Sequence, residues 1–346
     1  MTDPQWNDLL RVLRGERLKT LPAGLIIDSP WLPGWAGMTI LDYLASDSRW
    51  LSANLKAEER FPDVWFLPGF WSEFGMCTEP SAFGARCRFF EDAFPSVDKC
   101  LYDYSEIRRV KKPDPRTDGL LPLVTKRLVH TQPQIEQAGH RIRFAVARGP
   151  LNIASYLLGH TEFLLGIKTN PDETHQLLRV VTDFLVDWLE LQARTFDTIE
   201  GVLLLDDLLG FIGDADFREF ALPYLRDLYG ALNVPVKALH NDARGMITAR
   251  YLEELGVNLF NFAFEHSLSQ MREWAGEGVT LLGNIPPRDV LGRGSTADVH
   301  RSAAESLATL GDHRRLILSA GGGTPPGTPA ENIDALAAAA RTASTA

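Results

Sequence analysis

Five polar residues follow directly on two short apolar runs of this chain: Asp206, Asp207, His240, Asn241 and Asp242. The two runs, 202–205 and 234–239, flank an amphipathic segment over 214–230. This order predicts a strand–helix–strand unit, because parallel strands need a crossover connection that is usually helical. The polar side chains then gather at the carboxyl ends of both strands, where parallel α/β folds house their chemistry.

A cluster of carboxylates and one imidazole has two chemical uses. Mixed nitrogen and oxygen donors suit a zinc ion that keeps one position open for substrate. The candidate ligands are Asp206, Asp207, Glu219 and His240. Without a metal, acids beside a histidine hold a displaced proton for acid–base catalysis, with Asp206, His240 and Asp242 as the candidate catalytic residues. Structural roles compete, because Asp242 is also placed to cap a helix and Glu219 fits a solvated helix face.

Further residues are placed to bind a substrate at the same edge. Asp28 ends the first buried run and Asn284 ends a later one. Trp31 and Trp71 follow the first two runs, and tryptophan rings in loops would floor a pocket for a flat or cationic ligand. Gly322, the centre of a three-glycine run before a helix, would let an anion approach the backbone, although a tight turn is the alternative.

Eight short buried runs recur along the chain, and helical patterns separate most of them. The runs are 23–28, 63–68, 142–147, 202–206, 235–240, 258–264, 279–283 and 315–319. Eight strands that alternate with helices predict an α/β fold of the (β/α)8 TIM-barrel type. An open doubly wound sheet is the alternative, and it would require some of these runs not to be strands.

One segment departs from the alternation. Between about 75 and 140 the sequence shows turns, charges and a hairpin pattern, which predicts an insertion after the second strand. The clearest helix of the chain follows Asn170, where Pro171 and Glu173 supply the usual start signals. Because no second core or internal repeat is visible, we expect a single barrel domain over 1–346.

Composition narrows the classes of partner. The 346 residues carry a formal charge of −10, which disfavours nucleic acids and anionic membranes as partners. No run approaches the roughly 18 apolar residues of a membrane span, and the N-terminus lacks the order of a signal peptide. Three cysteines without CxxC spacing indicate a reducing compartment, so we expect a cytoplasmic protein and leave a homodimer open.

Six pieces of the chain, in this order, resemble the uroporphyrinogen decarboxylase superfamily: RGPLNIASYLLG (148–159), DDLLGF (206–211), FREFALPYLRDLY (217–229), LHND (239–242), GNIPPRDVL (283–291) and GGGTPPGTPAENIDAL (321–336). The resemblance covers about 148–336, with a looser match before it. It implies a (β/α)8 barrel with its active site at the carboxyl-terminal mouth. Besides porphyrinogen decarboxylases, this superfamily contains many corrinoid-dependent methyltransferases.

The motifs of the individual branches favour the methyltransferases. The decarboxylases carry an arginine-rich RQAGRY-like signature, whereas the comparable segment here, LIIDSPWLPGWAG (25–37), has no arginine. Thiol-directed methyltransferases hold zinc through His-x-Cys and a later cysteine, and this chain has His240-Asn241-Asp242 and a glycine run instead. Demethylating members resemble Glu-x14-Glu-x20-His, and twenty residues separate Glu219 from His240. The first position departs, since only twelve residues separate Asp206 from Glu219.

The resemblance therefore implies a methyltransferase that moves a methyl group between a small O- or N-methylated substrate and a corrinoid protein or related acceptor. Zinc would act as a Lewis acid on the heteroatom concerned. The corrinoid would come with a separate partner protein, because a chain of this length holds one barrel. A porphyrinogen decarboxylase and a ligand-binding barrel without catalysis are the alternatives.

Overall fold

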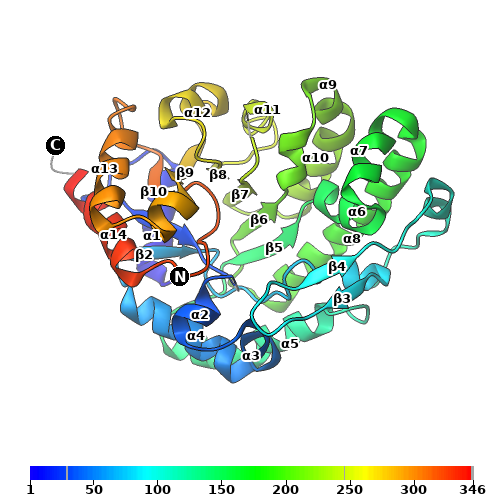
Figure 1. Cartoon of the computed structure of the whole chain (residues 1–346), viewed down its shortest axis with the longest axis horizontal. Coiled ribbons are helices and arrows are strands. Elements are labelled where there is room, and N and C mark those ends of the chain that lie inside the picture. Colours follow the sequence, from blue (N-terminus) through cyan, green and yellow to red (C-terminus); the bar gives the residue numbers. More distant parts are fainter. Residues whose placement is uncertain (29, 245, 344–346) are drawn as a thin grey trace.

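The computed structural model describes residues 1–28, 30–244 and 246–343 (Figure 1). Eight strands form one parallel sheet: β1 (Ala23–Ile26), β2 (Val64–Leu67), β5 (Phe144–Arg148), β6 (Gly201–Leu205), β7 (Val236–Asn241), β8 (Leu259–Phe262), β9 (Thr280–Ile285) and β10 (Leu316–Ala320). All eight predicted runs are confirmed as strands. Their order, β2-β1-β10-β9-β8-β7-β6-β5, is the circular order of a (β/α)8 barrel.

The helices surround the strands (Figure 1). They are α1 (Asp3–Leu13), α2 (Leu32–Ala36), α3 (Ile40–Ala45), α4 (Asp47–Arg60), α5 (Leu121–Gln137), α6 (Pro150–Leu158), α7 (His160–Thr169), α8 (Pro171–Thr195), α9 (Asp214–Asp216), α10 (Leu222–Ala231), α11 (Met246–Ala249), α12 (Leu268–Ala275), α13 (Thr296–Leu307) and α14 (Ala330–Ala343). The long helix after Asn170 is confirmed as α8, but the Asn170 side chain makes no capping hydrogen bond. No helix of residues 1–28, 30–244 and 246–343 combines the length and hydropathy needed to cross a membrane.

The interior of the barrel is filled by side chains that alternate along the strands. All eight strands contribute to one buried cluster, including β2 and β5, which stand at the two ends of the sheet order. Helix α1 closes the amino-terminal end of the barrel, because its Trp6 ring packs edge-on against Phe144, with ring centroids 5.5 Å apart. Beside the junction of β2 and β5, the backbone oxygen of Met1 accepts a hydrogen bond from the Arg141 N–H at 2.9 Å.

The segment between β2 and β5 holds both the predicted hairpin and a helix that was not expected. Strands β3 (Arg86–Arg88) and β4 (Ser96–Asp98) pair antiparallel, which confirms the hairpin. Helix α5 packs against α4 and leads into β5, so part of the predicted insertion is the helix of a regular βα unit. Pro133 inside the helix obscured it in the sequence, because proline removes a helical hydrogen bond and normally ends the pattern.

A buried acid on α4 makes stability depend on pH. The Glu58 side chain is 8% exposed, and its Oε1 lies 3.8 Å from Nδ1 of His140. Burial raises the pKa of Glu58 to about 7 and lowers the pKa of His140 to about 4. Since the folded-state pKa of Glu58 lies above the unfolded value of 4.5, its contribution to stability is present below 4.5 and is lost as the pH rises through 7.

We therefore expect Glu58→Gln to increase the free energy of unfolding at pH 8 by roughly 1–3 kcal/mol, because the variant buries no charge there. At pH 5 the same substitution should change the free energy little. Urea unfolding followed by circular dichroism at both pH values measures the difference. A stabilisation that is as large at pH 5 as at pH 8 would contradict the buried-acid explanation.

Candidate functional site

The strand register brings three predicted site residues, Asp206, Asp207 and His240, close to one unpredicted residue, Asn261. His240 on β7 pairs with Leu205 of β6 on one side and with Asn261 of β8 on the other. Asp206 and Asp207 follow Leu205 directly, so the acids lie beside the imidazole at the carboxyl end of the sheet. Parallel pairing thus produces the cluster that the sequence predicted at this edge.

The ring of His240 is held in one orientation by Asn261. Its Nδ1 lies 2.7 Å from Oδ1 of Asn261, and both side chains are buried. The Asn261 amide nitrogen donates to the backbone oxygens of Leu282 at 2.7 Å and Ala320 at 3.1 Å. With the amide nitrogen committed to β9 and β10, the amide oxygen must face His240, so Nδ1 carries the proton and donates it. The neutral ring therefore keeps its lone pair on Nε2.

Two carboxylates face this lone pair. Nε2 of His240 lies 3.9 Å from Oδ1 of Asp207 and 3.9 Å from Oδ2 of Asp242. The ligand atoms of the three residues all lie within 4.8 Å of one another, an arrangement that could hold a metal ion. Asp207 Oδ1 also accepts the backbone N–H of Asp242 at 3.0 Å, which ties the loop after β6 to the loop after β7. The carboxylates are partly exposed, so the cluster is open to solvent on one side.

The electrostatics of the cluster favour a bound proton or cation. Burial raises the pKa of Asp207 to about 6, His240 opposes this shift, and the nearby Asp242 adds to it. Two adjacent carboxylates cannot both ionise without repulsion, and either a shared proton or a cation relieves that repulsion. The group can therefore act in acid–base chemistry or bind a metal.

Asp206, predicted as both a ligand and a catalytic residue, lies outside this group of three. Its fully buried carboxylate accepts the backbone N–H groups of Leu151 at 3.0 Å and Asn152 at 3.1 Å, in the first turn of α6. A Cβ on Gly149 would stand 2.3 Å from Asp206 Oδ2, so only glycine allows this approach. The helix-capping role considered for Asp242 thus belongs to Asp206.

Glu219, the other predicted ligand, is not brought to the cluster. It lies on a π-helical turn, η4 (Phe217–Ala221), and its side chain is 59% exposed. Its Oε1 is 3.6 Å from Nε2 of His175 on α8, at the outer layer of helices. The spacing of twenty residues before His240 therefore does not produce a shared site here, and the solvated helix face describes Glu219 correctly.

Two predicted substrate-binding residues, Trp31 and Asn284, are held by contacts within the protein. Trp31 is buried, stacks on Trp35 with ring centroids 5.2 Å apart, and donates its indole N–H to the Thr328 backbone oxygen at 3.0 Å. Asn284 donates to the His266 backbone oxygen, and its Oδ1 accepts the Ser306 hydroxyl at 2.7 Å. The polar groups of both side chains are thus engaged with neighbouring loops and helices.

Two other predicted substrate-binding residues, Trp71 and Gly322, lie close to the barrel mouth. Trp71 is half-buried and packs against the cluster of side chains inside the barrel. Gly322 has φ +131°, and a Cβ on it would stand 3.3 Å from both Cβ and Oδ2 of Asp242. The predicted glycine run therefore borders the carboxylate cluster directly, and a larger residue at Gly322 would press on Asp242.

A second charged group at the mouth became visible only in three dimensions. Arg148, the last residue of β5, is buried, and its guanidinium bonds Glu73 at 2.6 Å and Glu79 at 3.3 Å. Burial lowers the pKa of Arg148, but the two glutamates outweigh it and raise the pKa overall. Burial and the charge of Glu73 raise the pKa of Asp28 well above its ordinary value, while Arg148 opposes them. Asp28 and Glu73 follow strand ends in the sequence, but their proximity to Arg148 is a tertiary feature.

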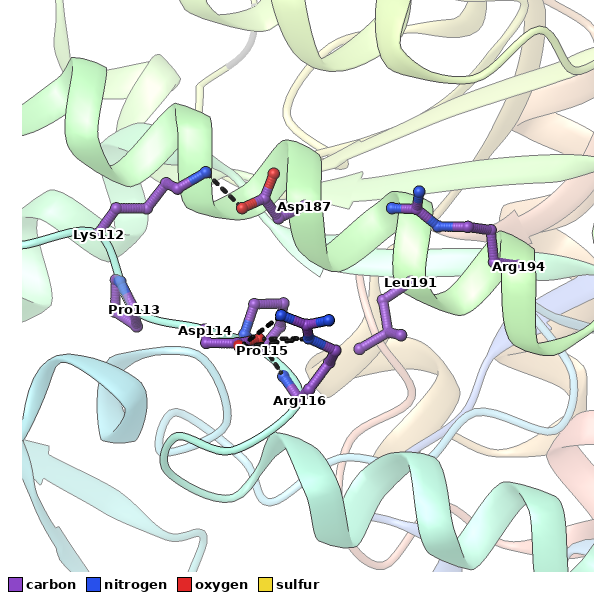
Figure 2. Close-up of a pocket in the computed structure, with 8 residues that line it drawn as sticks. All are labelled: Lys112, Pro113, Asp114, Pro115, Arg116, Asp187, Leu191 and Arg194. Carbon is purple, nitrogen blue, oxygen red and sulfur yellow. Dashed lines mark hydrogen bonds and ion pairs between the residues drawn. The ribbon is translucent and has the colours of Figure 1, made fainter.

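A surface pocket of about 610 Å³ lies away from the mouth, between the segment that precedes α5 and the outer face of α8 (Figure 2). Lys112 bonds Asp187 at 2.5 Å, Arg116 bonds Asp114 at 2.8 Å, and Arg194 bonds Glu190 at 2.8 Å. Because each of these cations already has an acidic partner, we do not place the function there.

The free energy of unfolding of two variants distinguishes the structural role of Asp206 from the role of its neighbour Asp207. Asp206→Ala would remove two hydrogen bonds to α6 and leave buried N–H groups without an acceptor, so we expect it to cost about 2–4 kcal/mol. Asp207→Ala, the matched control, removes a partly exposed acid that Asp242 repels, and should cost less than about 1 kcal/mol. Urea unfolding at pH 7 measures both. The reverse ranking would show that Asp206 is not the structural acid.

The orientation of His240 can be observed directly. In Asn261→Leu the imidazole loses its acceptor at Nδ1, so we expect the single Nδ1-protonated tautomer to become a mixture. The ¹⁵N chemical shifts of the ring nitrogens distinguish the two tautomers at a pH where the ring is neutral. Asn258→Leu, at the opposite end of β8, serves as the control and should leave the shifts unchanged. A wild-type ring protonated on Nε2 would refute the assignment.

Comparison with known proteins agrees with the architecture. A family model for Uroporphyrinogen decarboxylase (URO-D) matches residues 7–343. The uroporphyrinogen decarboxylase of Aromatoleum aromaticum is 25% identical over 272 residues, covering 75% of this chain and 74% of that protein. The enzyme of the same name from Thioalkalivibrio sulfidiphilus is 24% identical over 358 residues, covering 95% and 96%.

Among solved structures, a methyltransferase from Methanosarcina mazei has the same fold, with a TM-score of 0.80 at 20% sequence identity and 96% of each chain covered. The family match spans nearly the whole chain, including the amino-terminal part where the sequence resemblance was looser. The circular strand order and the polar cluster at the carboxyl ends of the strands fit this assignment. The chain therefore belongs to the uroporphyrinogen decarboxylase family, as its six sequence pieces indicated.

Proposed function

We propose that this chain is a methyltransferase that moves a methyl group between a small O- or N-methylated substrate and a corrinoid protein or related acceptor, assisted by a zinc ion. The observation that carries the proposal is the lone pair of His240 Nε2, which faces the carboxylates of Asp207 and Asp242. The family to which the chain belongs is enzymatic, and the structural neighbour from Methanosarcina mazei is named a methyltransferase.

The residues fit zinc in donor type, number and orientation. One imidazole nitrogen and two carboxylates make the three protein ligands typical of catalytic zinc, and the partly exposed side leaves room for a fourth. Donor atoms of a tetrahedral zinc site stand roughly 3.3–3.5 Å apart, somewhat closer than the 3.9 Å seen here, and the exposed carboxylates can rotate to close the difference. Asn261 supplies the outer hydrogen bond that metal-bound histidines usually make. Asp207 and His240 remain from the predicted ligand set, and Asp242 takes the place of Asp206 and Glu219.

When bound, zinc would supply Lewis acidity to the heteroatom that carries or receives the methyl group. The residues of the chain perform the remaining tasks. Asn261 keeps the Nε2 lone pair of His240 directed into the mouth. The backbone of Gly322 leaves free the space beside Asp242 that a side chain would occupy. Asp207, with its pKa of about 6, can give up its proton near neutral pH when a cation or a basic substrate arrives.

The proposed protein partner has a surface to meet at the mouth. Phe211, Met246 and Phe264, on the segments that follow β6, β7 and β8, are exposed large apolar side chains. The segments around Phe211 and Met246 pack together, and Phe264 lies against Gly321. Exposed apolar side chains that border one site are typical of interaction surfaces. A corrinoid-carrying protein would cover them while it presents its cofactor to the cluster.

A porphyrinogen decarboxylase is the second candidate, because curated relatives at 24–26% identity carry that name. Charge at the mouth disfavours it. Substrates of that class carry many carboxylates, whereas Arg148 is already bound by Glu73 and Glu79 and residues 25–37 contain no arginine. A polycarboxylate would also meet Asp207 and Asp242, whose charges repel it.

Metal analysis and two activity assays test the proposal. We expect purified protein to bind one equivalent of zinc. Losing an outer partner costs metal sites about 10–100-fold in affinity, so loss of the ligand in His240→Ala should cost at least that much. Glu219→Gln, a change at the exposed acid, is the matched control and should bind zinc like the wild type.

In the activity assays, the wild type should methylate a reduced corrinoid from at least one compound in a panel of methyl ethers and methylated amines. His240→Ala should lose this activity while its circular dichroism spectrum stays unchanged, because His240 lies at the carboxyl end of β7 and the substitution leaves both hydrophobic clusters intact. Carbon dioxide release from a porphyrinogen would instead establish the second candidate. If His240→Ala binds zinc as tightly as the wild type, the proposed metal site at His240 is refuted.

A further inference from the structure

Two of the three cysteines lie together at the hairpin between β2 and β5. Cys77 belongs to the loop after β2 and is completely buried, whereas Cys87 is the middle residue of β3 and is half-buried. Both cysteines are free, and the Cys87 side chain lies against Cys77. Cys100, the third cysteine, lies near the backbone oxygen of Phe83 and makes no such pair among the described residues.

Backbone contacts of the hairpin fix the position of both sulfur atoms. Cys77 Sγ lies 3.2 Å from the Ser96 backbone oxygen on β4 and accepts a hydrogen bond from the Arg88 backbone N–H on β3. Arg88 and Ser96 are register partners, so the Cys77 sulfur touches both strands at one rung of the hairpin. Cys87 Sγ lies 3.9 Å from the backbone oxygen of Cys77 itself. The two side chains are therefore neighbours at this rung, Cys77 from the loop and Cys87 from the strand.

The proximity of the two thiols makes them chemically unequal. It lowers the pKa of Cys87, against the opposing effect of burial, and it raises the pKa of Cys77. The thiolate is the nucleophile in disulfide exchange, so the more accessible Cys87 is the group that attacks. Cys77 lies behind it, in contact with the sulfur that an attack would modify.

From this geometry we propose that Cys77 and Cys87 form a dithiol site that reacts with small disulfides, of which glutathione disulfide is the probe. The Cys87 thiolate attacks one sulfur of the small disulfide, which releases one thiolate and leaves a mixed disulfide on Cys87. Cys77 then attacks the Cys87 sulfur, and the departing small thiolate takes up the Cys77 proton and leaves as the second small thiol. In sum, two protein thiols are oxidised to one Cys77–Cys87 disulfide, and one small disulfide is reduced to two thiols.

The site adjoins the charged group at the barrel mouth. Cys77 lies between Glu73 and Glu79 in the sequence, and both glutamates bind Arg148 at the end of β5. A Cys77–Cys87 bond would join this loop covalently to β3. Oxidation should therefore restrict the loop that holds Arg148, a consequence that does not depend on whether the chain transfers methyl groups.

The test uses reduced full-length protein incubated with glutathione disulfide and then alkylated under native and under unfolding conditions. We expect the number of alkylated thiols in unfolded protein to fall from three to one, and peptide mapping to identify a Cys77–Cys87 disulfide. Cys77→Ser should stop at the first step and accumulate one glutathione on residue 87. Cys87→Ser should lose the fast reaction, and Cys100→Ser, the matched control, should behave like the wild type.

Hydrogen exchange gives a readout that needs no variant. In the oxidised wild type, backbone amides of residues 73–79 should exchange more slowly than in the reduced protein, with a smaller change at Cys100. The proposal is overturned if three thiols remain alkylatable after incubation, if Cys100 reacts before Cys87, or if Cys77→Ser and Cys87→Ser react at the same rate. A glutathione adduct that stays on Cys87 in the wild type also overturns it, because Cys77 would then not resolve it.

Discussion

The geometry of the polar cluster at the barrel mouth depends on the hydrogen bond between His240 and Asn261. An imidazole between two carboxylates would ordinarily be free to place its proton on either nitrogen, and the two choices have opposite consequences for metal binding. Here the Asn261 amide is held by backbone oxygens of β9 and β10, so the choice is made by the sheet itself. Four neighbouring strands, β7 to β10, thus cooperate to direct one lone pair into the mouth.

The acids at the mouth differ in burial and therefore in role. Asp206 lies deepest and is used to cap α6, which joins the loop after β6 to the helix after β5. Its neighbour Asp207 lies nearer to solvent and faces His240, where a raised pKa keeps a proton exchangeable near neutrality. Glu73 and Glu79 neutralise Arg148 in a separate buried group. Consecutive residues therefore have unlike roles, because the strand ends there and each side chain leaves in a different direction.

Family membership and charge lead to different expectations of the substrate. The family model and the curated relatives share the name of a decarboxylase, yet a barrel of this type supports many reactions by variation of its mouth. In this mouth the only buried arginine of the charged group is paired internally, and the cluster around His240 is acidic. Such a surface suits a cation or a neutral substrate better than a polycarboxylate. The fold therefore constrains where the reaction takes place, and the local charges constrain what can enter.

The sequence by itself determined the architecture and the location of the site. Eight apolar runs, each ended by polar residues, predicted both the barrel and the edge at which His240 and Asp207 meet, because hydrophobic periodicity is a local property. It did not reveal α5, where Pro133 interrupts the helical pattern. It also could not assign individual roles to Asp206, Asp242 and Glu219, since each is an acid beside a strand or helix end. Only the tertiary structure decided that Asp206 binds α6, that Asp242 faces His240 and that Asn261 orients the ring. These roles depend on the direction in which each side chain leaves its strand or loop and, for Asp206 and Asn261, on hydrogen bonds between residues far apart in the chain.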